Sequence, residues 1–325
     1  MIIVPGNVPE YLEKSRSLEV DVLTLDLQDS LVNVDEVKLE GRAMVVAALR
    51  KSGTGGFKAR EVCVRVNSPS SRWFEDDINA VVPAGAESIR LTHAYGVQDV
   101  LHAEHCIKAA SGGREVDIQF GLDMPQALME LEDIARQSTL ISGISLSPSD
   151  FTLEMGSSNH GPRKPKNDDW LFYARSKIVT IARAKGWNAG DLSFTVDHQD
   201  TEAFRESMME SRAFGFDGTA LIYPRTIPMA NEVFGVSATD LAWAQDFVSK
   251  WDEQDKGPNW KRAFRMIDGK GYFAPTYEYA QRLITLDAVL RGDPESVKAF
   301  LEYGLGSAQY LSERRAAAEK PAGRS

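Results

Sequence analysis

Short apolar runs alternate with longer amphipathic stretches eight times along this chain, and this alternation constrains the fold more than any other feature. Runs rich in β-branched residues are typical of buried strands, and apolar residues three and four positions apart are typical of helices. The strand-like runs fall at residues 1–5, 20–30, 62–67, 88–94, 116–123, 141–150, 193–198 and 219–224. The pattern predicts an α/β protein, a (β/α)₈ TIM barrel. A doubly wound open sheet is the competing fold, but it usually has fewer strands and a G-x-G-x-x-G turn, which this sequence lacks.

The rhythm of strand and helix ends near residue 252. Helix-like stretches at 227–234 and 239–254 complete the eighth layer, and the remaining chain has helical patterns without matching strands. We therefore expect a TIM-barrel catalytic domain over residues 1–252. Residues 253–325 are expected to form a C-terminal helical extension that contacts a neighbouring subunit.

The formal net charge of -10 argues against nucleic acid and anionic membrane surfaces as partners. The first residues, MIIVPGN, lack the basic region of a signal peptide, and no run approaches the ~20 apolar residues of a membrane span. The sequence has two cysteines and no disulfide framework, and Cys63 lies in an apolar run that predicts burial. We expect a cytoplasmic protein.

Nearly every predicted strand ends in a charged or polar side chain. In a barrel, the carboxyl ends of the strands face one shared opening where active sites lie. Burying unpaired charges costs several kcal/mol, so a stable core alone does not explain them. These residues are Asp26, Gln28 and Asp29; Arg65 and Asn67; His93; Asp123; Ser147, Ser149 and Asp150; Asp197; and Tyr223 and Arg225. The pattern predicts a polar site at this end of the barrel.

Two of these carboxylates, Asp123 and Asp150, follow adjacent strands, so they are expected to meet on one divalent cation. Oxygen ligands from few protein groups suit Mg²⁺. Zinc is disfavoured because no Cys/His set converges here. His102 and His105, beside Cys106, form a second possible metal pair, although a solvated helix face is the simpler interpretation.

Arg65 is the one certain cation among the strand ends of the predicted site. An arginine at a strand end can be a structural ion-pair partner, but opposite metal-binding carboxylates it suits a bidentate clamp for a substrate carboxylate. A carbonyl held between Mg²⁺ and an arginine is placed to stabilise an enolate. This combination predicts cleavage or formation of a carbon–carbon bond next to a carbonyl.

Several motifs, in their order and spacing, resemble the citrate lyase beta subunit-like branch of the HpcH/HpaI aldolase superfamily. They are VPGNVPEYLEKS, LTLDLQDSL, RVNSP, YARSKIVTIARAKG, RAFGFDGTALIYPRTIPMANEVF and DGKGYFAPTYEYAQRLI, between about residues 4 and 283. The resemblance implies a (β/α)₈ barrel, Mg²⁺, homo-oligomers that are often trimers, and lyases for malyl-, citramalyl- or citryl-thioesters. The implied acyl carrier is coenzyme A (CoA) or an acyl carrier protein.

By resemblance, Arg65 grips the oxo-acid product and Asp150 is the metal ligand after strand six. Asp123, in DMP, takes the place of a glutamate in the family's E-T-P triplet, and Gln28 replaces a glutamate in D-L-E-D. Four departures are larger. His93 replaces the lysine of the family's L-P-K, and Tyr223 replaces the histidine of I-H-P. Phe273 replaces the second acid of the D-G-K-M-I-D motif, and Val8 replaces an arginine.

These observations lead to a Mg²⁺-dependent lyase of the aldolase or Claisen type. We assign catalysis to Arg65 with Asp26 or Asp29 as a base, and substrate binding to Arg65, Asn67, Ser147 and Tyr223. A hydroxyacyl-CoA thioester hydrolase on the same scaffold and a carrier-dependent subunit of a larger complex remain open alternatives.

Overall fold

The computed structural model describes residues 1–50, 56–157, 171–192, 200–255 and 264–294. Two compact units are present, residues 1–228 and 229–325, and each is considered by itself. The predicted domain boundary at residue 252 falls within a helix of the second unit, and the role of the chain beyond it stays a prediction.

An eight-stranded parallel sheet with strands in sequence order forms the centre of the first unit. Its strands are β1 (Ile2–Pro5), β2 (Val22–Asp26), β3 (Glu61–Arg65), β4 (Ser88–Leu91), β5 (Asp117–Leu122), β6 (Ile141–Leu146), β7 (Asn188–Asp191) and β8 (Gly218–Thr219). A parallel bridge joins Ile2 to Leu221, just beyond β8. The expected α/β class with parallel strands is confirmed; closure into a complete barrel stays a prediction.

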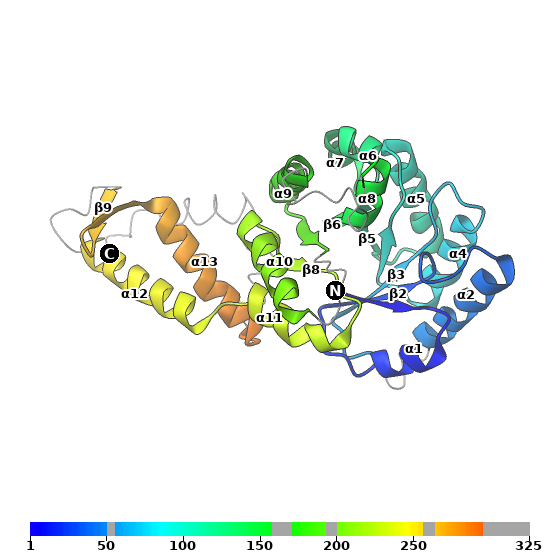
Figure 1. The fold of residues 1–325 in the computed structure, drawn as a ribbon, viewed down its shortest axis with the longest axis horizontal. Helices are drawn as coiled ribbons and strands as arrows, with labels where there is room; N and C mark the ends of the chain where they lie inside the picture. The colour runs from blue at the N-terminus through cyan, green and yellow to red at the C-terminus, as the bar shows by residue number, and fades with distance from the viewer. Residues whose placement is uncertain (51–55, 158–170, 193–199, 256–263, 295–325) are drawn as a thin grey trace, which may run out of the picture. The chain divides into compact units, whose positions relative to one another are not determined.

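Helices follow the strands along the chain, and α2, α4 and α5 lie side by side along the outside of the sheet (Figure 1). The helices of the first unit are α1 (Pro9–Ser15), α2 (Asp35–Arg50), α4 (Phe74–Ala84), α5 (Val97–Ala110), α6 (Pro125–Met129), α7 (Leu131–Gln137), α8 (Pro148–Glu154), α9 (Phe172–Lys185) and α10 (Thr201–Phe214). The short 3₁₀ helix Pro224–Thr226 and α11 (Ile227–Phe234) follow.

Local sequence sets where these elements begin and end. Proline occupies the first position of α6 and α8, where its fixed φ suits a helix and its missing N–H costs nothing. Gly85 ends α4 with φ 115°, a left-handed conformation that favours glycine. Strands β2 and β4 are buried almost throughout, as expected for a parallel sheet covered by helices.

Two expected strands differ from the structure. The run at 193–198, expected as strand seven, and its terminal Asp197 lie outside the described residues; the strand in this place is β7, four residues of sequence NAGD without a β-branched side chain. The run at 141–150 is a strand only to Leu146, because Pro148 begins α8. Asp150 therefore lies in the first turn of a helix.

The second unit contains α12 (Ala238–Asp255), the hairpin β9 (Phe264–Ile267) and β10 (Lys270–Phe273), and α13 (Ala274–Leu290). Phe247, Trp251, Ile267 and Leu283 are buried in one core of this unit. The hairpin was not expected from the sequence, whereas the two helices were. No helix in the described part of the chain is long and apolar enough to cross a membrane.

Lys38 of α2 holds the loop that follows β2. Its side chain is almost fully buried, and its ammonium donates hydrogen bonds to the carbonyl oxygens of Leu27 (2.9 Å) and Gln28 (2.7 Å). Burial lowers the pKa of Lys38, an effect that the carboxylates of Asp26, Asp77 and Asp29 oppose. The ammonium thus satisfies two backbone acceptors in the loop that carries Asp26 and Asp29.

Replacing Lys38 with methionine removes both donors while keeping an apolar stem. We expect Lys38→Met to lower the free energy of unfolding by about 2 kcal/mol, because two buried carbonyls lose their partners. Urea denaturation measures this loss, and Lys14→Met, an exposed change on α1, is the control. Equal stability of the two variants would contradict this role.

Candidate active site

A bidentate ion pair joins the ends of β2 and β3. The parallel register places Asp26 directly opposite Arg65. The guanidinium donates from Nε to Oδ1 (2.7 Å) and from Nη2 to Oδ2 (2.6 Å) of Asp26. Because both groups are planar, this geometry fixes the orientation of the arginine as well as its position.

Asp26 is fully buried, and its carboxylate is saturated with hydrogen bonds. Beyond Arg65, it accepts the backbone N–H groups of Gln28 (2.9 Å) and Ser30 (3.0 Å) and the Ser30 hydroxyl. Burial alone would raise the pKa of Asp26, but the charge and hydrogen bonds of Arg65 hold it below the ordinary value. Asp26 is thus a fixed anion that positions Arg65.

Asp29 binds the same guanidinium from the opposite side. Arg65 Nη1 donates to its Oδ2 at 3.0 Å, and the Asp29 side chain is 46% exposed. Burial disfavours the charged guanidinium, but Asp26 and Asp29 outweigh it and raise the pKa of Arg65. Arg65 stays a cation, and Asp29 keeps oxygen atoms accessible to a ligand.

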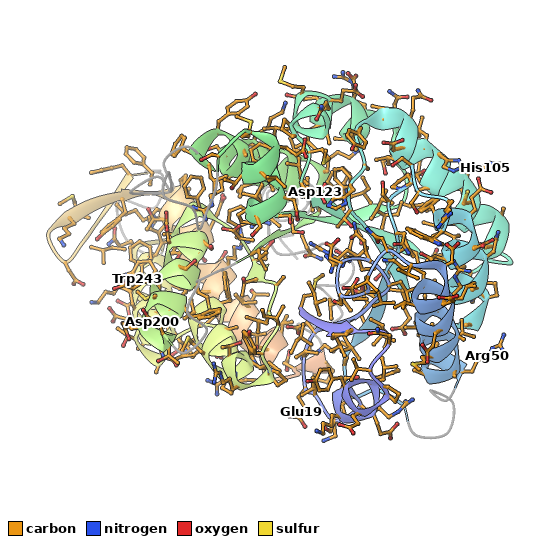
Figure 2. The ribbon with its side chains drawn as sticks, turned by 45° about the vertical axis from the view of Figure 1, so that its right-hand side comes forward. Glu19, Arg50, His105, Asp123, Asp200 and Trp243 are labelled. Atoms are coloured by element: carbon orange, nitrogen blue, oxygen red, sulfur yellow. The ribbon has the colours of Figure 1, made fainter. Side chains whose placement is uncertain are left out.

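Asp123 directly follows β5 and lies in the interior of the unit (Figure 2). Both of its carboxylate oxygens accept the backbone N–H of His93, at 3.0 and 2.9 Å. Burial raises the pKa of Asp123 to about 6; His93 opposes this shift and Asp150 adds to it. The neighbouring groups therefore do not fully offset the cost of burying the charge of the Asp123 carboxylate.

Asp150 is close enough to Asp123 to influence its pKa. Ser147, at the start of α8, donates its hydroxyl to Asp150 Oδ2 at 2.8 Å. One ligand atom each from Asp29, His93 and Asp150 lies within 4.8 Å of the other two. The strand-end residues Asp29, Asp123 and Asp150, which are far apart in sequence, thus gather with His93 at one end of the sheet.

The side chains of Gln28 and His93 contact each other directly. The Gln28 amide lies 2.8 Å from His93 Nδ1, and its other end meets the Thr92 hydroxyl. The amide nitrogen of Gln28 faces Nδ1 and the Thr92 hydroxyl donates to the amide oxygen, so Nδ1 accepts a hydrogen bond and the proton of the neutral imidazole resides on Nε2. His93 also has a φ of 51°, uncommon for a residue with a Cβ. Gln28 therefore sets which ring nitrogen of His93 carries the proton.

A buried cation that sequence reasoning did not select lies beside Arg65. Arg90 is opposite Arg65 in the β3–β4 register, and its side chain is buried. Burial and the charge of Arg65 lower the pKa of Arg90, while Asp123 and Asp26 act in the opposite direction. The sequence signal that could have identified Arg90 is a charged residue inside the fourth apolar run, where a buried strand was expected.

The remaining predicted residues have other partners. Asn67 is buried, and both its amide nitrogen and its backbone N–H donate to Asp77, at 2.6 and 3.0 Å. Tyr223 follows β8 with the Arg225 guanidinium 5.4 Å from its ring centre. The structure thus turns Asn67 toward α4, while Ser147 stays beside Asp150.

Oxygen donors and charge in this site fit a divalent cation. Arg65 serves Asp26 and Asp29, but within the described ranges neither Asp123 nor Asp150 forms an ion pair with a lysine or arginine. Two neighbouring carboxylates without such a partner repel each other, which agrees with the raised pKa of Asp123. Hard oxygen donors of this kind suit Mg²⁺.

Two lyases of known name are similar to this chain over most of its length. The citrate lyase subunit beta of Leuconostoc mesenteroides subsp. cremoris is 31% identical over 292 residues, which covers 88% of this chain and 92% of that protein. The mitochondrial citramalyl-CoA lyase of Rattus norvegicus is 27% identical and covers 88% and 85%.

Solved structures share the fold. CitE from Mycobacterium tuberculosis, determined in complex with magnesium, acetoacetate and coenzyme A, matches with a TM-score of 0.68 and 22% identity over 88% of this chain and 97% of that one. A citrate lyase from Burkholderia xenovorans LB400 matches with a TM-score of 0.72 and 16% identity over 90% and 92%. The HpcH/HpaI aldolase/citrate lyase family model matches residues 1–224, and the chain belongs to this family.

Proposed function

We propose that this chain is a Mg²⁺-dependent carbon–carbon lyase that acts on a 2-oxo acid or a hydroxyacyl-thioester. The observation that carries the proposal is the pair of carboxylates Asp123 and Asp150, which have no lysine or arginine partner among the described residues and lie next to the fixed guanidinium of Arg65. Family membership and the lyases among its relatives support this reaction class.

Asp150 and Asp123 would hold Mg²⁺, with Asp29 and His93 within reach. When bound there, the ion supplies a Lewis acid for a substrate carbonyl oxygen.

Arg65 is placed to bind the carboxylate of the 2-oxo acid. Three of its five N–H groups donate to Asp26 and Asp29. The other two, one on Nη1 and one on Nη2, are the donors that we propose for the substrate carboxylate. Asp26 acts through Arg65, so we propose it as a positioning residue.

Asp29 is the better candidate for the base because five hydrogen bonds already occupy the Asp26 oxygens. In the cleavage direction, Asp29 takes the substrate hydroxyl proton, directly or through water. The bond between the hydroxyl carbon and the thioester α-carbon breaks, and its electron pair stays on the α-carbon, which takes up a proton from solvent while Asp29 returns its own proton to solvent. The 2-oxo acid remains on Arg65.

Among the predicted substrate-binding residues, Ser147 orients Asp150 and Tyr223 borders the strand ends. Asn67 is hydrogen-bonded to Asp77, so we propose that it positions the end of β3 instead.

The proposal also includes closure of the sheet into a TIM barrel, which the Ile2–Leu221 bridge supports. It further includes CoA as a carrier, a cytoplasmic location, and a homo-oligomer, with a trimer as the expected form, that residues 253–325 help to build.

Arg65→Lys tests the clamp while keeping the charge. Lysine lacks the planar pair of donors, so we expect kcat/KM to fall more than about 100-fold. Release of 2-oxo acid from malyl-, citramalyl- and citryl-thioesters measures activity, and Arg72→Lys, an exposed arginine paired with Asp35, is the control. Free thiol without 2-oxo acid in the wild-type protein would instead support the thioester hydrolase.

Asp150→Asn tests the cation site. The change keeps the size of the side chain and removes its charge, so we expect Mg²⁺ binding to weaken and turnover to fall more than about 100-fold. Calorimetric Mg²⁺ titration measures binding apart from activity. Glu154→Gln, an exposed change on the same helix, is the control, and wild-type binding by Asp150→Asn would exclude this ligand.

The raised pKa of Asp123 predicts a pH dependence of Mg²⁺ affinity. The metal-free carboxyl has a pKa of about 6 against an ordinary value of 3.8, so a proton competes with Mg²⁺ as the pH falls through about 6. Without Mg²⁺, the contribution of Asp123 to the free energy of unfolding is complete below pH 3.8, and it is lost as the pH rises through about 6. Titrations from pH 5 to about 8 measure the affinity, and constant affinity across this range contradicts the assignment.

A further inference from the structure

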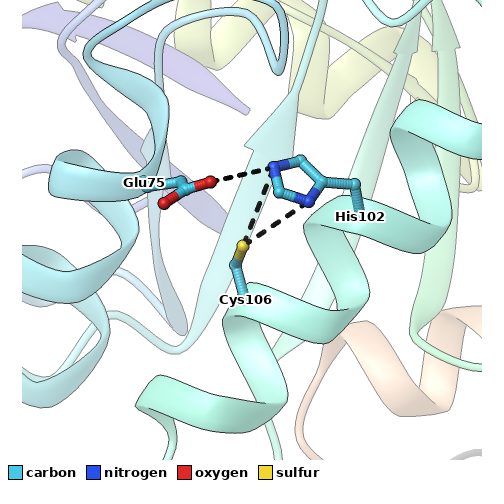
Figure 3. Close-up of side chains that lie close together, drawn as sticks. All are labelled: Glu75, His102 and Cys106. Atoms are coloured by element: carbon cyan, nitrogen blue, oxygen red, sulfur yellow. Dashed lines mark hydrogen bonds and ion pairs between the residues drawn. The ribbon is translucent and has the colours of Figure 1, made fainter.

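A second group of metal-binding side chains lies on the outside of the first unit. Glu75 comes from the first turn of α4, and His102 and Cys106 come from consecutive turns of α5 (Figure 3). One ligand atom of each residue lies within 4.8 Å of the other two. The two helices pack against each other, so the group bridges two elements of the fold.

The distances in this group approach those around a tetrahedral ion. His102 Nε2 lies 3.5 Å from Glu75 Oε1 and 3.9 Å from Cys106 Sγ. In a tetrahedral Zn²⁺ site, bond lengths of about 2.0 Å to nitrogen and oxygen and about 2.3 Å to sulfur place these ligand atoms about 3.3 and 3.5 Å apart. Cys106 Sγ lies almost as close to Nδ1, at 4.0 Å, so the contact with Glu75 selects Nε2 as the ligand atom, and side-chain rotations would close the difference.

The group is held by its surroundings. His102 and Cys106 are four residues apart on one helix, so their side chains share a face. The fully buried ring of Phe74 lies 5.5 Å from the imidazole of His102, centre to centre, and restricts its movement. Glu75 is the next residue on α4, and its largely exposed side chain contacts His102 Nε2.

We propose that Glu75, His102 and Cys106 bind a thiophilic divalent cation, Zn²⁺ in the first place, with water as the fourth ligand. A thiolate and an imidazole select Zn²⁺ over Mg²⁺, and the half-exposed side chains leave one side open to solvent. Binding replaces the proton of the Cys106 thiol, which is released to solvent as the metal–sulfur bond forms.

Electrostatics gives the ion a stabilising role. Glu75 and the thiolate form of Cys106 place two negative charges within 4.8 Å of each other, and a bound cation offsets their repulsion. An ion bound to both helices would join α4 to α5 and stabilise the folded state in proportion to its free concentration. This site is independent of the proposed lyase chemistry at the strand ends.

Co²⁺ is the probe, because a bound thiolate gives it a near-ultraviolet charge-transfer band that oxygen ligands do not. The titration uses the full chain, with saturating Mg²⁺ present and reducing conditions. We expect one Co²⁺ per chain to produce the band, and Zn²⁺ to displace it and raise the melting temperature. Cys106→Ser should abolish the band, and His102→Ala and Glu75→Gln should each weaken Co²⁺ binding at least about tenfold.

His105→Ala is the matched control, since this exposed histidine of α5 points away from the body of the unit (Figure 2). It should leave the band and the melting shift unchanged. Absence of the band in the wild-type protein, or its persistence in Cys106→Ser, would overturn the proposal. Because Mg²⁺ titration reports on the strand-end site separately, failure here leaves the proposed function untouched.

Discussion

The candidate active site depends on one buried ion pair, between Asp26 and Arg65. Removing two charges from water is costly, and this pair offsets the cost with a bidentate contact and further hydrogen bonds to the carboxylate. Because the two residues are register partners on β2 and β3, any slip between these strands would separate them. The orientation of Arg65 therefore depends directly on the correct pairing of β2 with β3.

Much of the fold could be predicted because strand and helix periods differ. The helix-like stretch at 227–234 matches α11, and the apolar runs at β1 to β6 mark real strands. β7 was missed because Asn188–Asp191 contains no β-branched or large apolar side chain, and sheet neighbours rather than propensity make it a strand. The hairpin β9–β10 was missed although its two-residue turn, Asp268–Gly269 with both residues at positive φ, is a strong local signal for a hairpin and sets its register.

Prediction of the site followed the rule that strand ends meet, which placed Asp26 beside Arg65 and Asp150 near Asp123. The sequence could not show how each oxygen is used. Asp26 was expected as a possible base, but the loop held by Lys38 turns two backbone N–H groups onto it. Asn67 was expected to face a substrate, but Asp77, ten residues later, takes its amide. Such competition among local partners becomes visible only in three dimensions.

Both oxygens of Asp123 accept the main-chain N–H of His93, while the imidazole of His93 lies near Asp29 and Asp150 and 3.7 Å from Asp123 Oδ2. The backbone N–H of His93 thus holds Asp123 in place, and the imidazole of His93 is the group available near the cation site. A different side chain at residue 93 would retain the anchor, provided that it tolerates the positive φ. A change of side chain at residue 93 would therefore alter the groups beside the cation site while the main-chain hydrogen bonds to Asp123 remain.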